Sequence, residues 1–344
     1  MALNYETATN LEAYLKILLF GLSGSGKSYA AAKAGGKTEK VAVLLLEPNG
    51  LPSIRASNPD AIVVMAYDPK RYGKVYVWEI VDQFMQDAMD GTLTRLGVTT
   101  IVVDSLTELQ RVWRDRTLID EGVARAMLAK HKMTQQQWGL WTERFRRLLR
   151  AFRDLPMNIV AVALVQNETD DDGNITAVVP SFEGKKLPSE VAQFFSAVGY
   201  CFKREFKIPT GEGDKTESKV EHKVMFQTGG KLVVKPFPGL DAIEAPDPKI
   251  WMAKYAASIA MGEIQPIVAG KTGEVDEDAV IQAVEAERKQ AEAAATTTTE
   301  PEAGSESKEP VSATEEAPVT RVARKKRSTA TTEPEAGSEP TSAK

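Results

Sequence analysis

The run from Gly21 to Ser28, GLSGSGKS, has glycine, lysine and serine at a spacing that can bind phosphate groups. In the pattern G-x-x-x-x-G-K-[ST], the glycines leave backbone N–H groups bare to contact an anion. The apolar run Leu15–Phe20 precedes the loop and the helix-favouring Tyr29–Lys33 follows it, as this site requires. Lys27 is expected to contact the β- and γ-phosphates, and the Ser28 hydroxyl to bind Mg²⁺. The sequence therefore predicts a site for ATP and Mg²⁺, formed by Gly21, Ser23, Gly24, Ser25, Gly26, Lys27 and Ser28.

A carboxylate that directs Mg²⁺ is expected at the end of a neighbouring strand. The apolar run Ile101–Val103 ends at Asp104, and Ser105 then opens a helical stretch. Asp104 is expected to act on Mg²⁺ mostly through water. The alternative is that Asp104 only caps the helix that follows it.

Two further polar residues stand where apolar runs end. Glu47 follows Val41–Leu46 and is expected to orient or deprotonate the attacking water. Gln166 follows Ile159–Val165, where its amide can hydrogen-bond the γ-phosphate and transmit its loss to the next segment. Because the carboxyl ends of parallel strands meet at one edge, both are expected to face the phosphate loop. The alternatives are a solvated strand end for Glu47 and a polar entry into a loop for Gln166.

Apolar runs of strand length alternate with helical patterns through the first 200 residues. The runs are apolar along almost their whole length, as expected for parallel strands covered on both faces. The pattern predicts an α/β fold with a three-layer core, a mostly parallel sheet and right-handed crossovers. The predicted strands are Lys16–Phe20, Val41–Leu46, Ala61–Ala66, Thr99–Asp104 and Asn158–Gln166, and the predicted helices are Ser28–Ala34, Tyr76–Met89, Ser105–Ala129 and Thr134–Leu155.

The pattern changes after Gln166. A polar turn, Asp170–Asn174, joins two strand-like pieces, and Pro188–Val198 is predicted to be helical. Shorter strands joined by turns then predict an antiparallel extension of the sheet, closed by a last helix at Pro248–Met261. These late strands are predicted at Val198–Phe206, Lys223–Thr228 and Lys231–Lys235.

Composition divides the chain at residue 262. Residues 263–344 contain no aromatic side chain and repeat the sequence TTEPEAGSE at Thr298–Glu306 and Thr331–Glu339. They carry 17 acidic and 10 basic side chains, a net of −7, which leaves +2 for residues 1–262 because the whole chain carries −5. Such a stretch cannot bury enough apolar surface to fold. The prediction is an ATPase domain at 1–262 and a disordered Ala/Thr/Glu/Pro-rich tail at 263–344, with a marginal helix within Asp276–Ala295 and an acidic character suited to a protein partner.

The order of the phosphate loop, Glu47, Asp104 and Gln166 resembles that of the RecA-like ATPase core. The chain is similar, over residues 13–245, to compact phage-encoded RecA-like "AAA domain" nucleotide-binding proteins, including the Sak-type single-strand annealing group. The resemblance implies a RecA-like P-loop fold in which Glu47 activates water and Gln166 couples the nucleotide to DNA-binding loops. One departure is Leu45, which stands where RecA has an aspartate. The matching segments include Gln137–Trp141, Leu155–Val160 and Pro180–Lys186.

The resemblance also implies partners and a role. The role is ATP-dependent phage DNA recombination, single-strand annealing or repair, with single-stranded DNA and further copies of the chain, in a ring or filament, as partners. The helix at 134–155 directs arginines away from its apolar stripe, which indicates a solvated or subunit-facing surface or, alternatively, a nucleic-acid stripe. Lysines and an arginine on the late strands could reach the γ-phosphate of a neighbouring subunit. The two basic sets are Arg144, Arg147, Arg150 and Arg153, and Lys203, Arg204, Lys207, Lys231 and Lys235.

Two other functional classes stay open. A nucleotide-switched protein-binding module without DNA contact fits the weak positive charge of residues 1–262 and the acidic tail. A small-molecule kinase also uses a phosphate loop, but such kinases usually carry an arginine-rich lid. The polar loops Asn167–Asn174 and Pro209–Asp214 contain no arginine.

The remaining reactive side chains are predicted to be structural. Cys201 is the single cysteine, lies in an apolar run and is expected to pack in the core. His131 and His222 lack metal-ligand partners at a useful spacing. No run of 18 apolar residues occurs, so the sequence predicts no membrane contact and a cytoplasmic protein, in the host cell if it is phage-encoded.

Overall fold

The structure is a computed structural model that describes residues 14–35, 38–184, 186–209, 216–227, 230–261, 280–286 and 289. The chain divides into two units, Met1–Thr298 and Thr299–Lys344, and the second lies outside the described residues. The predicted disorder of residues 263–344 also falls outside them, except at 280–286 and 289. Residues 280–286 are helical, and Asn167 donates a 3.2 Å hydrogen bond from Nδ2 to Ile281 O.

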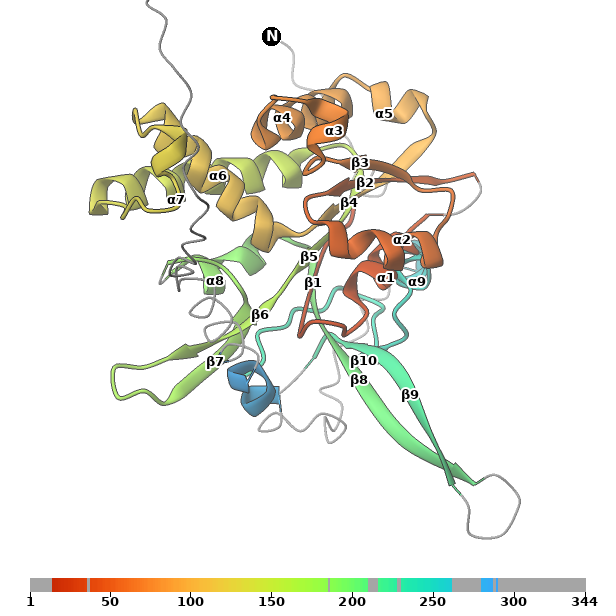
Figure 1. Cartoon of the computed structure of the whole chain (residues 1–344). Helices are drawn as coiled ribbons and strands as arrows, with labels where there is room; N and C mark the ends of the chain where they lie inside the picture. Colours follow the sequence, from red (N-terminus) through yellow and green to blue (C-terminus); the bar gives the residue numbers. More distant parts are fainter. Residues whose placement is uncertain are drawn as a thin grey trace, which may run out of the picture. The chain divides into compact units, whose positions relative to one another are not determined.

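Within the described residues, eight strands form one mixed sheet in the order β10-β9-β8-β1-β5-β4-β2-β3 (Figure 1). Every neighbouring pair from β8 to β3 is parallel, whereas β9 and β10 run antiparallel to their neighbours. The α/β fold with a mostly parallel sheet and an antiparallel C-terminal extension is therefore confirmed. The strands are β1 Lys16–Phe20, β2 Lys40–Leu45, β3 Ile62–Met65, β4 Val98–Asp104, β5 Asn158–Ala163, β8 Ala197–Pro209, β9 Thr216–Met225 and β10 Ile243–Glu244.

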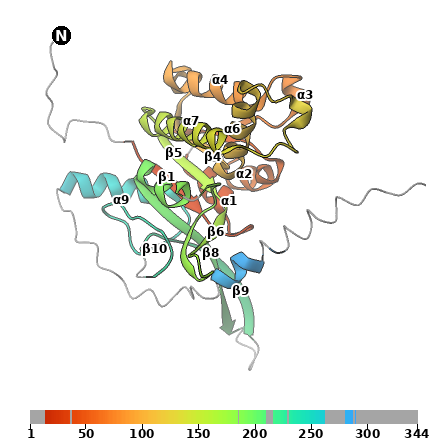
Figure 2. The same ribbon diagram turned by 90° about the vertical axis from the view of Figure 1, so that its left-hand side faces the viewer.

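Alternating residues of each parallel strand enter two different cores, because successive side chains point to opposite faces of a sheet. Leu18 and Phe20 of β1 pack in the core that α4, α6 and α7 cover. Ile17 and Leu19 pack in the core that α1, α2 and α9 cover, so the sheet lies between two helical layers (Figures 1 and 2). The helices are α1 Lys27–Ala32, α2 Leu51–Ser57, α3 Pro69–Tyr72, α4 Val77–Met89, α5 Thr92–Arg95, α6 Leu106–Asp120, α7 Gln135–Asp154, α8 Leu187–Glu190 and α9 Pro248–Met261.

The longest of these helices, α7, forms where the sequence predicts it. Thr134 and Gln137 make reciprocal side-chain bonds to each other's backbone N–H, which satisfies donors at the start of the helix. Apolar residues then recur every three or four positions and bury one face of the helix against the sheet. The buried residues of that face are Trp141, Phe145, Leu148, Leu149 and Phe152.

The strand predicted at Asn158–Gln166 is shorter than expected. β5 ends at Ala163, and the next five residues form β6, Val165–Thr169, which pairs with β7, Ile175–Pro180, in a separate two-stranded sheet. Leu164 leaves the main sheet because Thr107 Oγ1 accepts its N–H at 3.0 Å and the Ser181 N–H donates to its carbonyl at 2.7 Å. The sequence does not reveal this bend, because the apolar run Ile159–Val165 continues across it without a turn signal.

Other predicted bounds also need correction. The helix predicted at Ser105–Ala129 ends at Asp120, and that predicted at Pro188–Val198 comprises α8 and a 3-10 turn at Val191–Phe194. The segment at 231–235 is no strand and makes isolated bridges through Leu232 and Lys235. β9 pairs with β8, and both strands are longer than the predicted Val198–Phe206 and Lys223–Thr228.

Candidate nucleotide-binding site

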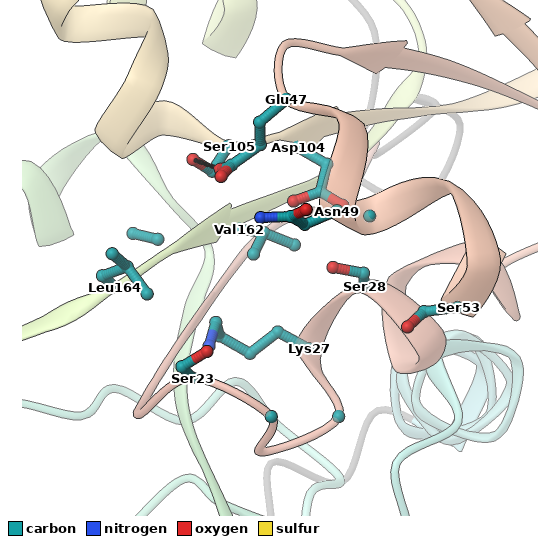
Figure 3. Close-up of a pocket in the computed structure, with 14 residues that line it drawn as sticks. Ser23, Lys27, Ser28, Glu47, Asn49, Ser53, Asp104, Ser105, Val162 and Leu164 are labelled. Carbon is teal, nitrogen blue, oxygen red and sulfur yellow. Dashed lines mark hydrogen bonds between the residues drawn. The ribbon is translucent and has the colours of Figure 1, made fainter.

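Four strand ends meet at one edge of the sheet because of their register. Phe20 pairs with Ala163, and Asp104 pairs with both Val162 and Leu45. The residues that follow β1, β2, β4 and β5 therefore leave the sheet at nearly the same level. A cavity of about 420 Å³ opens there, lined by the phosphate loop, the segment after Glu47, the end of β4 and the end of β5 (Figure 3).

The phosphate loop follows β1, and its glycines are required by close contacts. A Cβ atom on Gly21 would lie 2.5 Å from Cys201 O of β8. Gly26 has a φ of 90°, a conformation that costs other residues strain, and it begins α1. Cys201 itself is buried, which raises the pKa of its thiol to about 12 and confirms its place in the core.

Lys27 lies inside the loop that carries it. Its side chain is 7% exposed, and Nζ donates to Gly21 O at 2.9 Å and to Leu22 O at 2.7 Å. These carbonyls hold the ammonium at the mouth of the cavity, next to the bare N–H groups of the loop. Ser23, Gly24, Gly26 and Ser28 line the same cavity, and Ser25 of the loop is buried.

Asp104 presents a buried carboxylate to the cavity. It is 3% exposed, and its Oδ2 is buried without a hydrogen-bond partner among the described residues. Burial raises the pKa of Asp104 to about 6, and the nearby Glu47 carboxylate adds to the rise. A hydrogen bond from Ser28 and the charge of Lys27 oppose that rise in the pKa. Asp104 Oδ2 is therefore available to a cation bound in the cavity.

The oxygen donors at this place fit Mg²⁺. The Ser28 hydroxyl and the Asp104 carboxylate both line the cavity (Figure 3). Mg²⁺ favours one or two such protein oxygens and takes its other ligands from phosphates and water. Within the described ranges, no group of three or more His, Cys, Asp or Glu residues could hold a metal ion by itself.

The segment after Glu47 supplies site residues that sequence reasoning missed. Asn49 and Ser53 line the cavity, and Figure 3 shows the Asn49 side chain within it. A Cβ atom on Gly50 would lie 2.6 Å from Asp104 Oδ2 and 2.9 Å from Leu45 Cδ1. Gly50 therefore leaves the space that the Asp104 carboxylate occupies. The run Pro48-Asn49-Gly50 is a turn signal in the sequence, and it marks the 3-10 turn that leads into α2.

Glu47 lies on the far side of the cavity from the loop. Its Oε1 accepts a 2.7 Å hydrogen bond from Ser105 Oγ, and the same Ser105 oxygen accepts the Glu108 N–H at the start of α6. Ser105 is therefore the residue that caps α6, which speaks against the capping alternative for Asp104. The structure thus brings Lys27, Ser28, Glu47 and Asp104 to one cavity.

Gln166 is placed differently. It lies in β6, opposite Val179, and its Oε1 accepts a 3.2 Å hydrogen bond from Ser181 Oγ. It is not among the residues that line the cavity, where Leu164 is the last residue from this part of the chain. The bend after Ala163 therefore separates Gln166 from the other predicted site residues.

The predicted basic residues also have definite positions. Each of the four predicted arginines of α7 is ion-paired, within 3.9 Å, with Asp120, Glu143 or Asp154. Lys235 Nζ donates to Phe195 O at 2.7 Å, and the side chain of Lys207 lies outside the described residues. Lys203 and His222, on β8 and β9, lie against the phosphate loop of their own chain.

A phosphate loop after the first strand, an aspartate at the end of β4 and a mostly parallel sheet between helices define an α/β P-loop nucleotide-binding protein. The family model described as AAA domain matches residues 13–232, so the chain belongs to this family. No curated protein matches the chain. Among the helices that the structure describes, none is long and apolar enough to cross a membrane.

Proposed function

We propose that the chain binds ATP with Mg²⁺ and hydrolyses it. The observation that carries this proposal is Asp104 Oδ2, which has no hydrogen-bond partner among the described residues and is buried in the same cavity as Lys27, Ser28 and Glu47. A buried carboxylate oxygen without a partner is costly, and a bound cation relieves that cost. Family membership supports nucleotide binding in general.

The residues have distinct roles in this proposal. The loop N–H groups and Lys27 bind the phosphates, and Ser28 and Asp104 hold Mg²⁺, which when bound neutralises charge on the β- and γ-phosphates. Glu47 orients the attacking water and accepts its proton, while Ser105 keeps the Glu47 carboxylate at the cavity wall. Gln166 retains its proposed role only as a coupling residue, because it acts from the β6–β7 hairpin.

Two substitutions test this assignment. Lys27→Ala should weaken binding of a fluorescent ATP analogue by about 100-fold or more, because it removes the buried cation of the loop. Glu47→Gln should keep binding and slow hydrolysis by about 100-fold. Lys249→Ala and Glu121→Gln, both exposed and outside the cavity, serve as matched controls. Unchanged binding in Lys27→Ala would refute the proposal.

The use of ATP is proposed more specifically as DNA recombination, single-strand annealing or repair by a ring or filament of this chain. This part of the proposal is supported by the resemblance to RecA-like proteins. The resemblance implies that single-stranded DNA and further copies of the chain are partners. Measuring hydrolysis with and without single-stranded DNA at low salt tests it, because a DNA-coupled ATPase accelerates on binding. A rate that does not change, with no DNA binding, would exclude this role.

The alternative, a nucleotide-switched protein-binding module, has one observation in its favour. The four predicted arginines of α7 are ion-paired with three carboxylates, which weakens the electrostatic attraction of that helix for phosphate backbones. Nucleotide-dependent capture of a protein partner that resists nuclease treatment would support this alternative.

A further inference from the structure

The ribbon formed by β8 and β9 lies beside the phosphate loop. Lys203 and His222 are directly opposite each other in the antiparallel register of this ribbon. Alternation along the strands places both on the face that carries Cys201 and Val224, which are buried in the core on the α1 side of the sheet. This pair of side chains therefore faces the loop.

His222 contacts the backbone of the loop. Its Nδ1 lies 3.0 Å from Ser25 O and would lie 2.8 Å from a Cβ atom on Gly26. Because a carbonyl oxygen only accepts hydrogen bonds, Nδ1 carries the proton in this contact. The ring is thus packed on the loop, and this fixes the distance between the loop and the ribbon.

Lys203 reaches the tip of the same loop. Its Nζ lies 3.4 Å from the position that a Cβ atom on Gly24 would take, and Gly24 lines the nucleotide cavity. The side chain is exposed, and among the described residues no carboxylate pairs with its ammonium. Lys223, on the opposite face of the ribbon, is by contrast paired with Glu221 at 3.0 Å.

We propose that Lys203 is a phosphate-binding residue of the nucleotide site in its own chain. Its ammonium would add a second cation to Lys27 and neutralise charge on the triphosphate, as cations do in phosphoryl transfer. His222 is a positioning residue that holds the loop against the ribbon. This inference rests on the proposed nucleotide binding. It places Lys203 at the phosphates bound by its own chain, whereas the sequence suggested that Lys203 could reach the γ-phosphate of a neighbouring subunit.

Lys203→Ala in the full chain tests the inference. It should weaken binding of fluorescent ATP and ADP analogues about tenfold and lower kcat/KM for hydrolysis by a similar factor, because a charge-assisted contact is lost. Lys203→Arg should recover most of the affinity. Lys223→Ala removes the same charge from the opposite face of the ribbon and should stay within about twofold of the natural chain.

Two outcomes would overturn the inference. One is equal nucleotide affinity in Lys203→Ala and Lys223→Ala while Lys27→Ala still abolishes binding, which leaves the proposed function intact. The other is recovered hydrolysis when Lys203→Ala chains are mixed with Lys27→Ala chains, because Lys203 would then act on a neighbouring subunit. Failure of the proposed function itself is distinguishable, since Lys27→Ala would then bind nucleotide normally.

Discussion

The nucleotide cavity and the outer face of α7 both gather charged side chains, and they differ in what those charges contact. In the cavity, Asp104 and Lys27 are buried, and one Asp104 oxygen has no partner among the described residues. On α7, Arg147, Arg150 and Arg153 are exposed to water and paired with carboxylates of the same helix. Buried charge that the fold leaves unsatisfied indicates a ligand, whereas exposed and paired charge indicates a solvated surface.

The largest expected effect that tests this comparison follows from substituting Asp104. Asp104→Asn should slow hydrolysis by about 100-fold, because Mg²⁺ loses its protein carboxylate. It should also stabilise the ligand-free chain at pH 8 by on the order of 1–3 kcal/mol, because the cost of a buried carboxylate disappears. Chemical denaturation and steady-state hydrolysis measure the two effects, and a destabilised variant would contradict the account.

The pH dependence of the unfolding free energy tests whether the pKa of Asp104 is raised. The pKa of Asp104 is raised from 3.8 to about 6 in the folded chain, so the folded state binds more protons between these values. The contribution of Asp104 to stability is therefore lost as the pH rises from about 4 to about 6. In Asp104→Asn, the unfolding free energy should no longer fall between about pH 4 and about pH 6. If it falls with pH as steeply as in the natural chain, the raised pKa of Asp104 is refuted.

Two glycine substitutions, one in each region, should change the stability of the chain in opposite directions, by smaller amounts. Gly50→Ala should destabilise the chain by about 1–3 kcal/mol and lower nucleotide affinity, because its Cβ would clash with the Asp104 carboxylate. Gly139→Ala on α7 meets no atom within 4 Å and should stabilise the helix by about 0.5–1 kcal/mol. Thermal unfolding of both variants checks this, and equal shifts would remove the distinction.

The smallest effect is expected on α7 itself. Arg147→Ala and Arg150→Ala break exposed ion pairs with Glu143 and should change the unfolding free energy by less than about 1 kcal/mol. Binding to single-stranded DNA should also stay within about twofold. If either variant instead weakened binding and lowered its salt dependence, α7 would be a nucleic-acid surface after all.

The parts of the site that sequence predicts best are those whose geometry is local. β1 and α9 have the predicted bounds, and the phosphate loop adopts its conformation from glycines within eight residues. Asp104 and Glu47 follow apolar strands, and parallel pairing brings their ends to one edge of the sheet. Local residue types and strand period are enough for these predictions.

The parts that sequence misses depend on contacts between distant segments. Gln166 lies outside the cavity because Thr107 and Ser181 hydrogen-bond the backbone of Leu164, which turns the chain away from the main sheet. His222 reaches the loop because β9 pairs with β8, whereas the sequence predicted this strand only from Lys223 onward. Gly50 leaves room for the carboxylate of Asp104, which is 54 positions away in the chain. No local sequence pattern predicts this contact.

The position of β5 has a mechanical consequence. It lies between the strand that leads into the phosphate loop and the strand that ends at Asp104, and it is hydrogen-bonded to both. The width of the cavity is therefore tied to this one strand, since the two walls cannot separate without disturbing its pairing. After Ala163 the same strand continues through Leu164 into the β6–β7 hairpin. The carboxyl end of β5 therefore both separates the two walls of the cavity and leads directly into the hairpin.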